Sequence, residues 1–336
     1  MADLVMSDTG GGVELITNSY RPRINPKTNQ AFIVNGYGEI VRNSRLDATE
    51  WQYIDTEISK MARVRMEGIT DLRAAGLVRT NVDIGVAEIK KRIQSEFTAA
   101  NVRMDTESVI ENDRSDKKAI TVPLPVISKG YKINERELRA SRNAGIPLDT
   151  TEAIEAAQSV AETAESILFN GTTAVTVNGN AVKGYLNATG ALSDTGSNMG
   201  GGDFATADNA YKTVVGTIGA LEARRYRGPF MIYLNSVQFF ETLTLRSNTD
   251  TTQYDLIKRL PQVLDVKISP EVTAGTMVVV QMTPDVVEIY EALPIQNREW
   301  EAPNRSAFFA QVLTVMIPVI QYNYNSQTGI ALISSV

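Results

Sequence analysis

Residues 131–171 constrain the fold most strongly, because they predict one long helix with recognisable signals at both ends. Asp149 suits the N-cap, and Glu152 three residues later completes a capping box. Gly171 after Asn170 provides a left-handed stop. The predicted helix, residues 150–169, is about 30 Å long, enough to cross a small domain. Its apolar face contains Ile154, Ala157, Ala161, Ala164 and Leu168. The opposite face, predicted to be exposed to solvent, contains Glu152, Glu155, Gln158, Glu162 and Glu165.

The composition excludes most familiar enzyme chemistry, because the 336 residues contain no cysteine and no histidine. Disulfides, thiolate nucleophiles, serine–histidine triads and thiolate or imidazole metal sites are therefore absent. We predict no catalytic, cofactor-binding or metal-binding residues, no cofactor and no small-molecule substrate. The net charge of −6 argues against a dedicated nucleic-acid reader. Without an apolar span or a signal peptide, the chain reads as soluble and not secreted, with no membrane partner.

A second long helix is predicted from Thr49 to about Leu77. Asp47 or Thr49 would cap it, and Gly76 lies where it should end. Its apolar stripe, which Arg65 interrupts, is typical of a core-facing helix. The stripe consists of Trp51, Ile54, Ile58, Met61, Ile69 and Leu72.

Residues 83–133 carry many charges of both signs, so we do not expect them to form part of the core. Two strands, Phe97 to Ile110 and Ala119 to Ile127, could pair around a polar tip at Glu111 to Lys118. Pro123 and Pro125 would confine the return strand to a sheet edge. A projecting hairpin of this kind would need partner surface to become ordered. The alternative is a charged, solvated surface loop.

Residues 172–205 are rich in turns and are predicted to form a flexible surface loop. Their glycine run, residues 200–202, precedes Asp203 instead of the Lys-Ser or Lys-Thr of a phosphate-binding loop. Residues 1–46 are also loop-rich, with a strand-like run from Ala31 to Val34. They read either as an arm that packs on a neighbour or as a partly disordered terminus.

The rest of the chain mixes helices and strands in an order that indicates an α+β fold. Thr206 could cap a helix that reaches Tyr226. Near its C-terminal end lie Arg224, Arg225 and Arg227. Their positive charge suits the helix dipole, and we prefer this interpretation to a polyanion-binding site. The further predicted elements are strand 230–234, helices 236–245 and 254–260, and strands 265–268, 277–282, 286–290, 308–322 and 330–333.

The order of the motifs over residues 47–336 resembles the encapsulin-like branch of the tailed-bacteriophage major capsid fold. A helix with the pattern WxxID at residues 51–55 is followed by the charged segment and by the capped helix ending in LFNG at 168–171. A Gly-Tyr-Leu turn at 184–186 and the run GPFMIYLN at 228–235 complete the set. The order of all of them is specific, although no single motif is.

The resemblance implies a division of the chain into the parts of a capsid subunit. It implies a long N-terminal helix and an extended loop that lies across an adjacent subunit. A peripheral domain built on the spine helix would accompany an axial domain around five-fold and six-fold positions. The implied ranges are 1–48 for the N-terminal arm, 49–82 for the long helix, 83–133 for the extended loop, 134–228 with 296–336 for the peripheral domain (spine helix 150–169), and 229–295 for the axial domain.

The function implied is a non-enzymatic major capsid protein of a tailed phage or prophage, forming an icosahedral head around double-stranded DNA. Its partners would be copies of itself in pentamers and hexamers, with portal, scaffolding and decoration proteins and non-specifically packaged DNA. Assembly in the host bacterial cytoplasm would place it in the virion. One alternative is an encapsulin-like compartment enclosing cargo enzymes, which the 48 residues before Thr49 disfavour. Another is a carboxylate-dependent enzyme on an unrelated α+β fold. Some shells of this fold form lysine–asparagine cross-links, but the required residues cannot be matched, so no cross-link is predicted.

Overall fold

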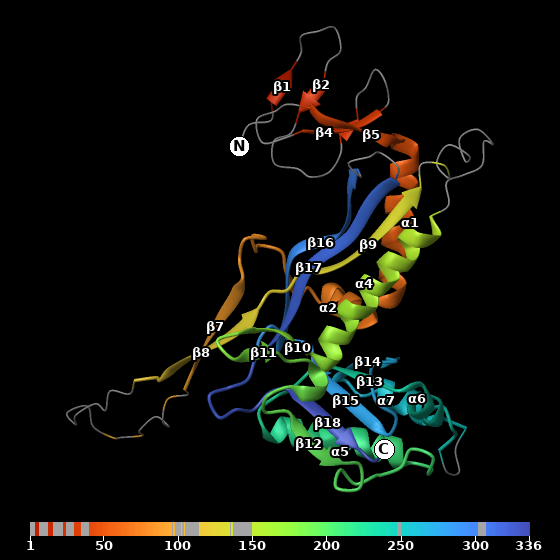
Figure 1. Cartoon of the computed structure of the whole chain (residues 1–336). Coiled ribbons are helices and arrows are strands. Elements are labelled where there is room, and N and C mark those ends of the chain that lie inside the picture. The colour runs from red at the N-terminus through yellow and green to blue at the C-terminus, as the bar shows by residue number, and fades with distance from the viewer. Residues whose placement is uncertain are drawn as a thin grey trace. The chain divides into compact units, whose positions relative to one another are not determined.

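The computed structural model describes residues 4–6, 13–15, 23–24, 30–34, 40–95, 97, 102, 104, 114–134, 136, 150–246, 250–301 and 307–336. The chain divides into two compact units (Figure 1). The first unit consists of Met1–Arg65, Val126–Glu162 and Pro294–Thr314. The second consists of Met66–Pro125, Thr163–Leu293 and Val315–Val336. The α+β class predicted from the sequence is confirmed.

The first unit contains short N-terminal strands, a helix and a long strand pair. Strand β9 pairs antiparallel with β17 from Ile127↔Thr314 to Asn134↔Ala307. The hydroxyl of Tyr131 on β9 accepts a hydrogen bond from Asn297 Nδ2 at 2.8 Å. The predicted run 31–34 lies within β4. The elements that begin in this unit are β1 (Leu4–Met6), β2 (Val13–Leu15), β3 (Arg23–Ile24), β4 (Gln30–Val34), β5 (Ile40–Asp47), α1 (Ala48–Arg65), β9 (Ile127–Asn134), α4 (Thr151–Asn170) and β17 (Ala307–Ile320).

The single helix predicted over residues 49–77 is wrong, because the chain forms two helices. Helix α1 ends at Arg65, and α2 (Glu67–Ala74) begins after Met66, whose φ of −105° and ψ of 69° are not helical. The break falls where Arg65 interrupts the apolar stripe. Gly76 has a φ of +72°, so the predicted C-terminal stop is confirmed. The side chains of Asp47 and Thr49 lie outside the described ones, and their capping role stays a prediction.

Helix α4 has 20 residues and ends where the sequence predicts. Gly171 has a φ of +68°, and a Cβ there would lie 2.4 Å from the Val182 carbonyl oxygen. Both the backbone conformation and the close approach therefore require glycine. The buried alanines confirm the apolar face, but Glu165 is only 4% exposed, so its assignment to the solvent-exposed face is wrong. Asp149, the predicted cap, lies outside the described residues.

The second unit is built on a five-stranded mixed sheet with the order β12-β18-β15-β13-β14. Strand β18 pairs in parallel with β12 and antiparallel with β15, while β13 pairs antiparallel with β15 and in parallel with β14. The strands are β12 (Leu192–Thr195), β13 (Phe230–Leu234), β14 (Val263–Ile268), β15 (Thr276–Gln281) and β18 (Ile330–Ser334).

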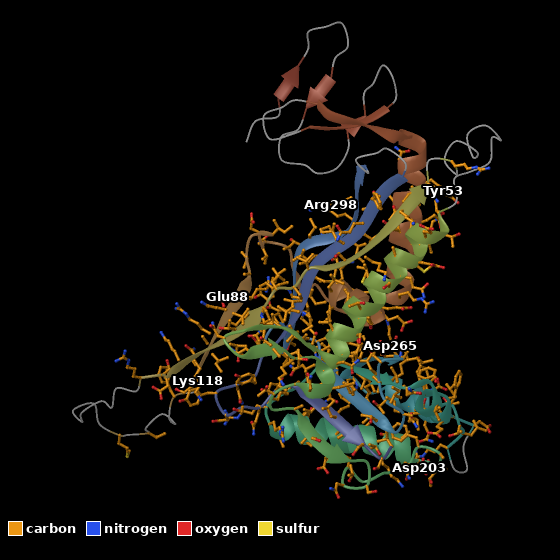
Figure 2. All side chains as sticks on the ribbon, viewed as in Figure 1. Tyr53, Glu88, Lys118, Asp203, Asp265 and Arg298 are labelled. Carbon is orange, nitrogen blue, oxygen red and sulfur yellow. The ribbon has the colours of Figure 1, made fainter. Side chains whose placement is uncertain are left out.

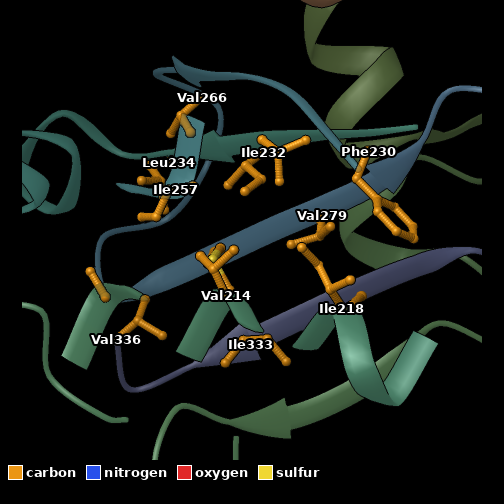
Figure 3. Close-up of a cluster of buried hydrophobic side chains, with 14 of the residues drawn as sticks. Val214, Ile218, Phe230, Ile232, Leu234, Ile257, Val266, Val279, Ile333 and Val336 are labelled. Atoms are coloured by element: carbon orange, nitrogen blue, oxygen red, sulfur yellow. The ribbon is translucent and has the colours of Figure 1, made fainter. Parts of the chain in front are cut away.

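Helices α5 (Asn209–Ala223) and α7 (Gln253–Lys258) contribute to one hydrophobic core with this sheet (Figure 3). Strand residues alternate between two faces, so Phe230, Ile232 and Leu234 enter this core. Tyr233 points the other way and makes edge-to-face contact with Phe169 of α4, with ring centroids 5.2 Å apart. The core also includes Val214, Ile218, Ile257, Val266, Val279, Ile333 and Val336.

Several other boundaries differ from those predicted. Helix α5 begins after Asp208, whose φ is +71°, and not at Thr206. Its end at Ala223 places the three arginines just beyond its C-terminus, as the dipole argument expects. The remaining elements of the second unit are α6 (Ser236–Thr242), β6 (Val78–Arg79), β7 (Glu88–Gln94), β8 (Lys117–Pro123) and β16 (Val287–Glu301), which is much longer than the predicted 286–290.

The prediction of a flexible loop at residues 172–205 is wrong. The segment forms a β10–β11 hairpin (Thr172–Val177 and Asn180–Val182), a 3₁₀ turn at Tyr185–Asn187, and β12. Within the glycine run, Gly201 packs closely against α5, since a Cβ there would lie 2.2 Å from Thr213 Oγ1. Gly201 therefore marks tight packing against the helix.

Candidate assembly surfaces

Strands β7 and β8 form an antiparallel pair in the charged segment (Figure 1). Glu88 pairs with Pro123 at one end, and Gln94 pairs with Lys117 at the other. Figure 2 shows Glu88 and Lys118 near these opposite ends. The charged segment therefore contains an antiparallel strand pair, formed by 88–94 and 117–123, while the predicted outgoing strand 97–110 stays a prediction. Most of 97–110 lies outside the described residues. We call β7 and β8 together the stem.

The two faces of the stem differ in chemistry because opposed residues of an antiparallel pair share a face. The inner face carries Ile89, Ile93 and Val122, all less than 10% exposed. The outer face carries Lys90, Arg92 and Lys117, all exposed. The alternation is hidden in the sequence because Lys91 lies on the inner face between two isoleucines.

The inner face is anchored by a buried carboxylate, Glu288 of β16, whose side chain is 2% exposed. Arg79 of β6 donates to it at 2.8 Å, and Lys91 of β7 makes an ion pair with its other oxygen. Burial alone would raise the pKa of Glu288, but the hydrogen bonds from Lys91 and Arg79 outweigh it and hold the pKa below its ordinary value. The carboxylate therefore stays charged and ties β7 to β16.

A second anchor lies nearer the far end of the stem, at Tyr324. Lys118 Nζ lies 4.2 Å from the centroid of the Tyr324 ring, a cation–π contact. The Tyr324 hydroxyl donates to Asp116 Oδ2 at 3.3 Å. Two separate polar contacts thus orient a strand pair that could not be stable alone.

A buried polar junction joins α2, α4 and the sheet within the second unit. Glu165 of α4 accepts hydrogen bonds from the backbone N–H groups of Gly68 (2.7 Å) and Ile69 (3.3 Å). Asp71 of α2 accepts from the Tyr233 hydroxyl at 3.1 Å and pairs with Lys267 of β14. Desolvation raises the pKa of Glu165 to about 7, and the two backbone donors only partly offset it.

These two acids do not form a catalytic carboxylate pair, because each has structural partners that occupy it. Among the described residues, no cluster of three acidic side chains could hold a metal ion. A cavity of about 200 Å³ lies between β8, the β10–β11 turn and the end of β17, and its titratable lining residues are Lys183 and Tyr322. It offers no carboxylate for acid–base chemistry.

Helix α6 presents an apolar surface to solvent. The exposed large apolar side chains are Val237 and Phe240 on the helix and Leu243 and Leu245 just after it, and Phe240 is 62% exposed. Their spacing places Val237 and Phe240 on one side of the helix. Exposed apolar groups of this density are common at protein–protein contacts. None of the helices in the described part of the chain is long and apolar enough to cross a membrane.

These parts define the fold of the tailed-phage major capsid proteins. The virus-like particle from Pyrococcus furiosus aligns over 80% of this chain and 100% of its own, with 14% identity and a TM-score of 0.52. The capsid of Myoviridae phage XM1 aligns over 80% and 92%, with 12% identity and a TM-score of 0.57. The capsid of a native GTA particle aligns over 78% and 89%, with 16% identity and a TM-score of 0.56.

Within this fold, the chain belongs to the family DUF6260, a family of unknown function, whose model matches residues 41–330. The match includes parts of both units and the residues that anchor the stem. No curated protein matches the chain.

Proposed function

We propose that this protein is the major capsid protein of a tailed phage or prophage, and that it assembles into an icosahedral shell enclosing double-stranded DNA. The observation that carries the proposal is the alignment of 78–80% of this chain with 89–100% of capsid and virus-like-particle subunits. The match extends over 78–80% of the chain and is not confined to one shared motif. The role is structural, without catalysis.

The parts of the subunit follow from this proposal. The stem belongs to the extended loop, residues 83–133, which would contact an adjacent copy. Helix α4 would be the spine of the peripheral domain (134–228 and 296–336), and residues 229–295 would form the axial domain. The exposed side chains of α6 fall in this axial range and would be covered by other copies in pentamers and hexamers. Residues 1–48 would form the N-terminal arm.

Other partners follow by the same reasoning. Portal, scaffolding and decoration proteins would bind the assembled shell, and packaged DNA would contact it without sequence specificity. A net charge of −6 would limit adhesion of DNA to the wall. Assembly would occur in the bacterial cytoplasm, and the mature protein would reside in the virion.

The second candidate is an encapsulin-like compartment with enzyme cargo. The observation in its favour is full coverage of the Pyrococcus furiosus particle subunit by this fold. The two candidates differ in content, since a phage head encloses DNA and a compartment encloses protein.

Negative-stain electron microscopy and light scattering of the purified protein test shell formation. We expect closed particles tens of nanometres across, or sheets and tubes of capsomers. A homogeneous small oligomer at every salt and protein concentration would contradict both candidates. Nuclease-protected DNA in particles from the native source would favour the phage head, and a stoichiometric co-purifying enzyme would favour the compartment.

A further inference from the structure

Two asparagine–glycine pairs lie in the described part of the chain, at residues 170–171 and 178–179. Such a pair is chemically labile, because the backbone nitrogen after the asparagine can attack the side-chain amide. Glycine has no Cβ to obstruct the attack. The two pairs differ in the hydrogen bonds that hold the reacting atoms, so the fold should make their reactivity unequal.

Asn178 and Gly179 form the exposed turn between β10 and β11, with Val177 paired to Asn180 on either side. The φ angles are +52° at Asn178 and +77° at Gly179, as in the two-residue turns that favour Asn-Gly. A Cβ at Gly179 would meet nothing within 4 Å. Neither the Asn178 side chain nor the Gly179 N–H has a hydrogen-bond partner among the described residues. The reacting atoms are therefore unrestrained and reached by water.

Asn170 and Gly171 form the same dipeptide, but hydrogen bonds restrain it. Asn170 Nδ2, the nitrogen that would have to leave, donates to Glu271 Oε2 at 2.6 Å. The Gly171 nitrogen, which would have to attack, donates to the Ile167 carbonyl oxygen at 3.0 Å. The Asn170 carbonyl oxygen accepts from Asn187 Nδ2 at 2.8 Å. Reaction would break these bonds and place a new carboxylate beside Glu271, so this pair is protected.

We propose that Asn178 is a site of self-modification, in which the Gly179 nitrogen attacks Cγ of Asn178. The new N–C bond closes a succinimide ring while the Cγ–Nδ2 bond breaks, and ammonia leaves with the proton from the Gly179 nitrogen. Water then opens the ring at either carbonyl carbon and gives aspartate or isoaspartate. One water is consumed, one ammonia is released, and nothing is oxidised or reduced. The inference goes beyond the proposed function and does not depend on it.

The modification would change both the charge and the backbone of the hairpin. Either product adds one negative charge, which takes the net charge of −6 to −7. Isoaspartate also adds a methylene group to the main chain, so the turn could not keep the pairing of Val177 with Asn180. The hairpin lies against β8 (Figure 1), and Gly179 lines the 200 Å³ cavity together with Thr121 and Val122 of β8. Isoaspartate would therefore loosen the hairpin where it faces the stem.

Peptide mapping by mass spectrometry tests the site in the folded, full-length protein. The protein is incubated in heavy-oxygen water at pH 6 and at pH 8, and fragment ions locate each modified residue. We expect residue 178 to lose its amide nitrogen and gain one solvent oxygen, faster at pH 8 because the attacking nitrogen must lose its proton. Asn170 should react at least about tenfold more slowly, which corresponds to about 1.4 kcal/mol of additional barrier from its hydrogen bonds.

Unfolding in urea provides the control for the role of the fold. The hydrogen bonds of Asn170 are then lost, so both sites should react at similar rates. N178Q is the control for the chemistry, since its longer side chain would have to close a less favoured, larger ring. We expect N178Q to show no product at residue 178 and an unchanged rate at Asn170.

A second measurement separates the added charge from the added methylene group. N178D carries the charge on an ordinary backbone, whereas incubated natural protein also contains isoaspartate. The amides of β10 and β11 should exchange hydrogen several-fold faster in the isoaspartate form than in freshly prepared N178D. Equal exchange in the two forms would contradict loosening of the hairpin by the longer backbone.

Three outcomes of the mapping would overturn the proposed site. The first is equal reaction of Asn170 and Asn178 in the folded protein. The second is an intact Asn178 in the folded protein at pH 8 under conditions in which the unfolded chain reacts. The third is a difference between the two sites that persists in urea, which would assign the reactivity to neighbouring sequence and not to the fold. None of these measurements requires shell assembly, so their failure is distinct from failure of the proposed function.

Discussion

The Glu165 carboxylate accepts a 2.7 Å hydrogen bond from the backbone N–H of Gly68, 97 residues earlier in the chain. This contact places a buried acid at the first turn of α2, where unpaired N–H groups point. The approach favours glycine, since a Cβ at Gly68 would lie 2.9 Å from Leu168 Cδ2 and 3.0 Å from Glu165 Oε1, and both side chains would have to shift. Docking of α2 on α4 therefore depends on one acid and one glycine together.

We expect Glu165 to make stability decrease as pH rises. Its pKa in the folded protein is raised to about 7. Between its ordinary pKa and 7, the unfolded chain loses this proton while the folded chain keeps it, so unfolding is favoured progressively with rising pH. The free energy of unfolding should fall by on the order of 3 kcal/mol, and the decrease should level off above pH 7.

The measurement is the free energy of unfolding from urea titrations between pH 4 and 8, compared with E165Q. Subtracting the variant removes the contributions of other acids, including Glu288, whose depressed pKa acts in the opposite direction. Parallel curves for the two proteins would show that Glu165 does not titrate in this range.

Two buried tyrosines should respond oppositely to loss of their hydroxyl groups. The Tyr233 hydroxyl donates to Asp71, so Y233F should cost about 1–3 kcal/mol. The Tyr185 hydroxyl is buried and has no hydrogen-bond partner in the described part of the chain. Y185F should therefore be neutral or stabilising by about 1 kcal/mol. Thermal unfolding of both variants checks this, and an equal loss in both would contradict it.

Two glycines of α5 provide a matched pair. A Cβ at Gly216 would lie 2.0 Å from the Met199 carbonyl oxygen, whereas one at Gly219 would meet nothing within 4 Å. We expect G216A to destabilise the fold by about 1–3 kcal/mol through overpacking. G219A should stabilise by about 0.5–1 kcal/mol through helix propensity. Denaturant midpoints measure the difference, and similar midpoints would refute close packing of residues 196–202 on α5.

Glu288 should control the order of the stem. E288Q removes the charge that pairs with Arg79 and Lys91, so the backbone amides of β7 should exchange hydrogen several-fold faster. E88Q is the control, because it breaks only the exposed pair with Lys90. Exchange measured by mass spectrometry should separate the two variants. If the β7 amides exchange at the same rate in E288Q and the natural protein, then contacts other than those of Glu288 stabilise the stem.

The folded-state charge of Glu288 also gives the stem a pH dependence. Because its pKa is held low, its contribution is present above the ordinary glutamate pKa and is lost as pH falls through the folded-state pKa. Exchange of the β7 amides should therefore accelerate in acid. E288Q should lack this acceleration, and its persistence there would assign the effect to another acid.

The local sequence pattern alone predicts the elements of this fold whose bounds and faces do not depend on distant residues. Strand β13 matches its predicted bounds because five consecutive buried residues lie between Gly228-Pro229 and Asn235. Helix α4 follows from its alanine spacing and from Gly171. In both cases the sequence period and the end signals agree.

The errors arise where a distant partner overrides local chemistry. Glu165 reads as a solvated acid because its partners on α2 lie almost 100 residues away. Lys91 obscures the alternation of β7 because Glu288, which neutralises it, lies 197 residues away. The stem's location was therefore predictable from its charge, but its register and faces were not.

Strand β18 lies between β12 and β15 in the five-stranded sheet, although it comes from residues 330–334. During synthesis, the neighbouring strands emerge from the ribosome with a vacant position between them. The sheet cannot close until this late strand is delivered. A chain that ends before residue 330 would lack this strand, and β12 and β15 would be left without the neighbour that joins them.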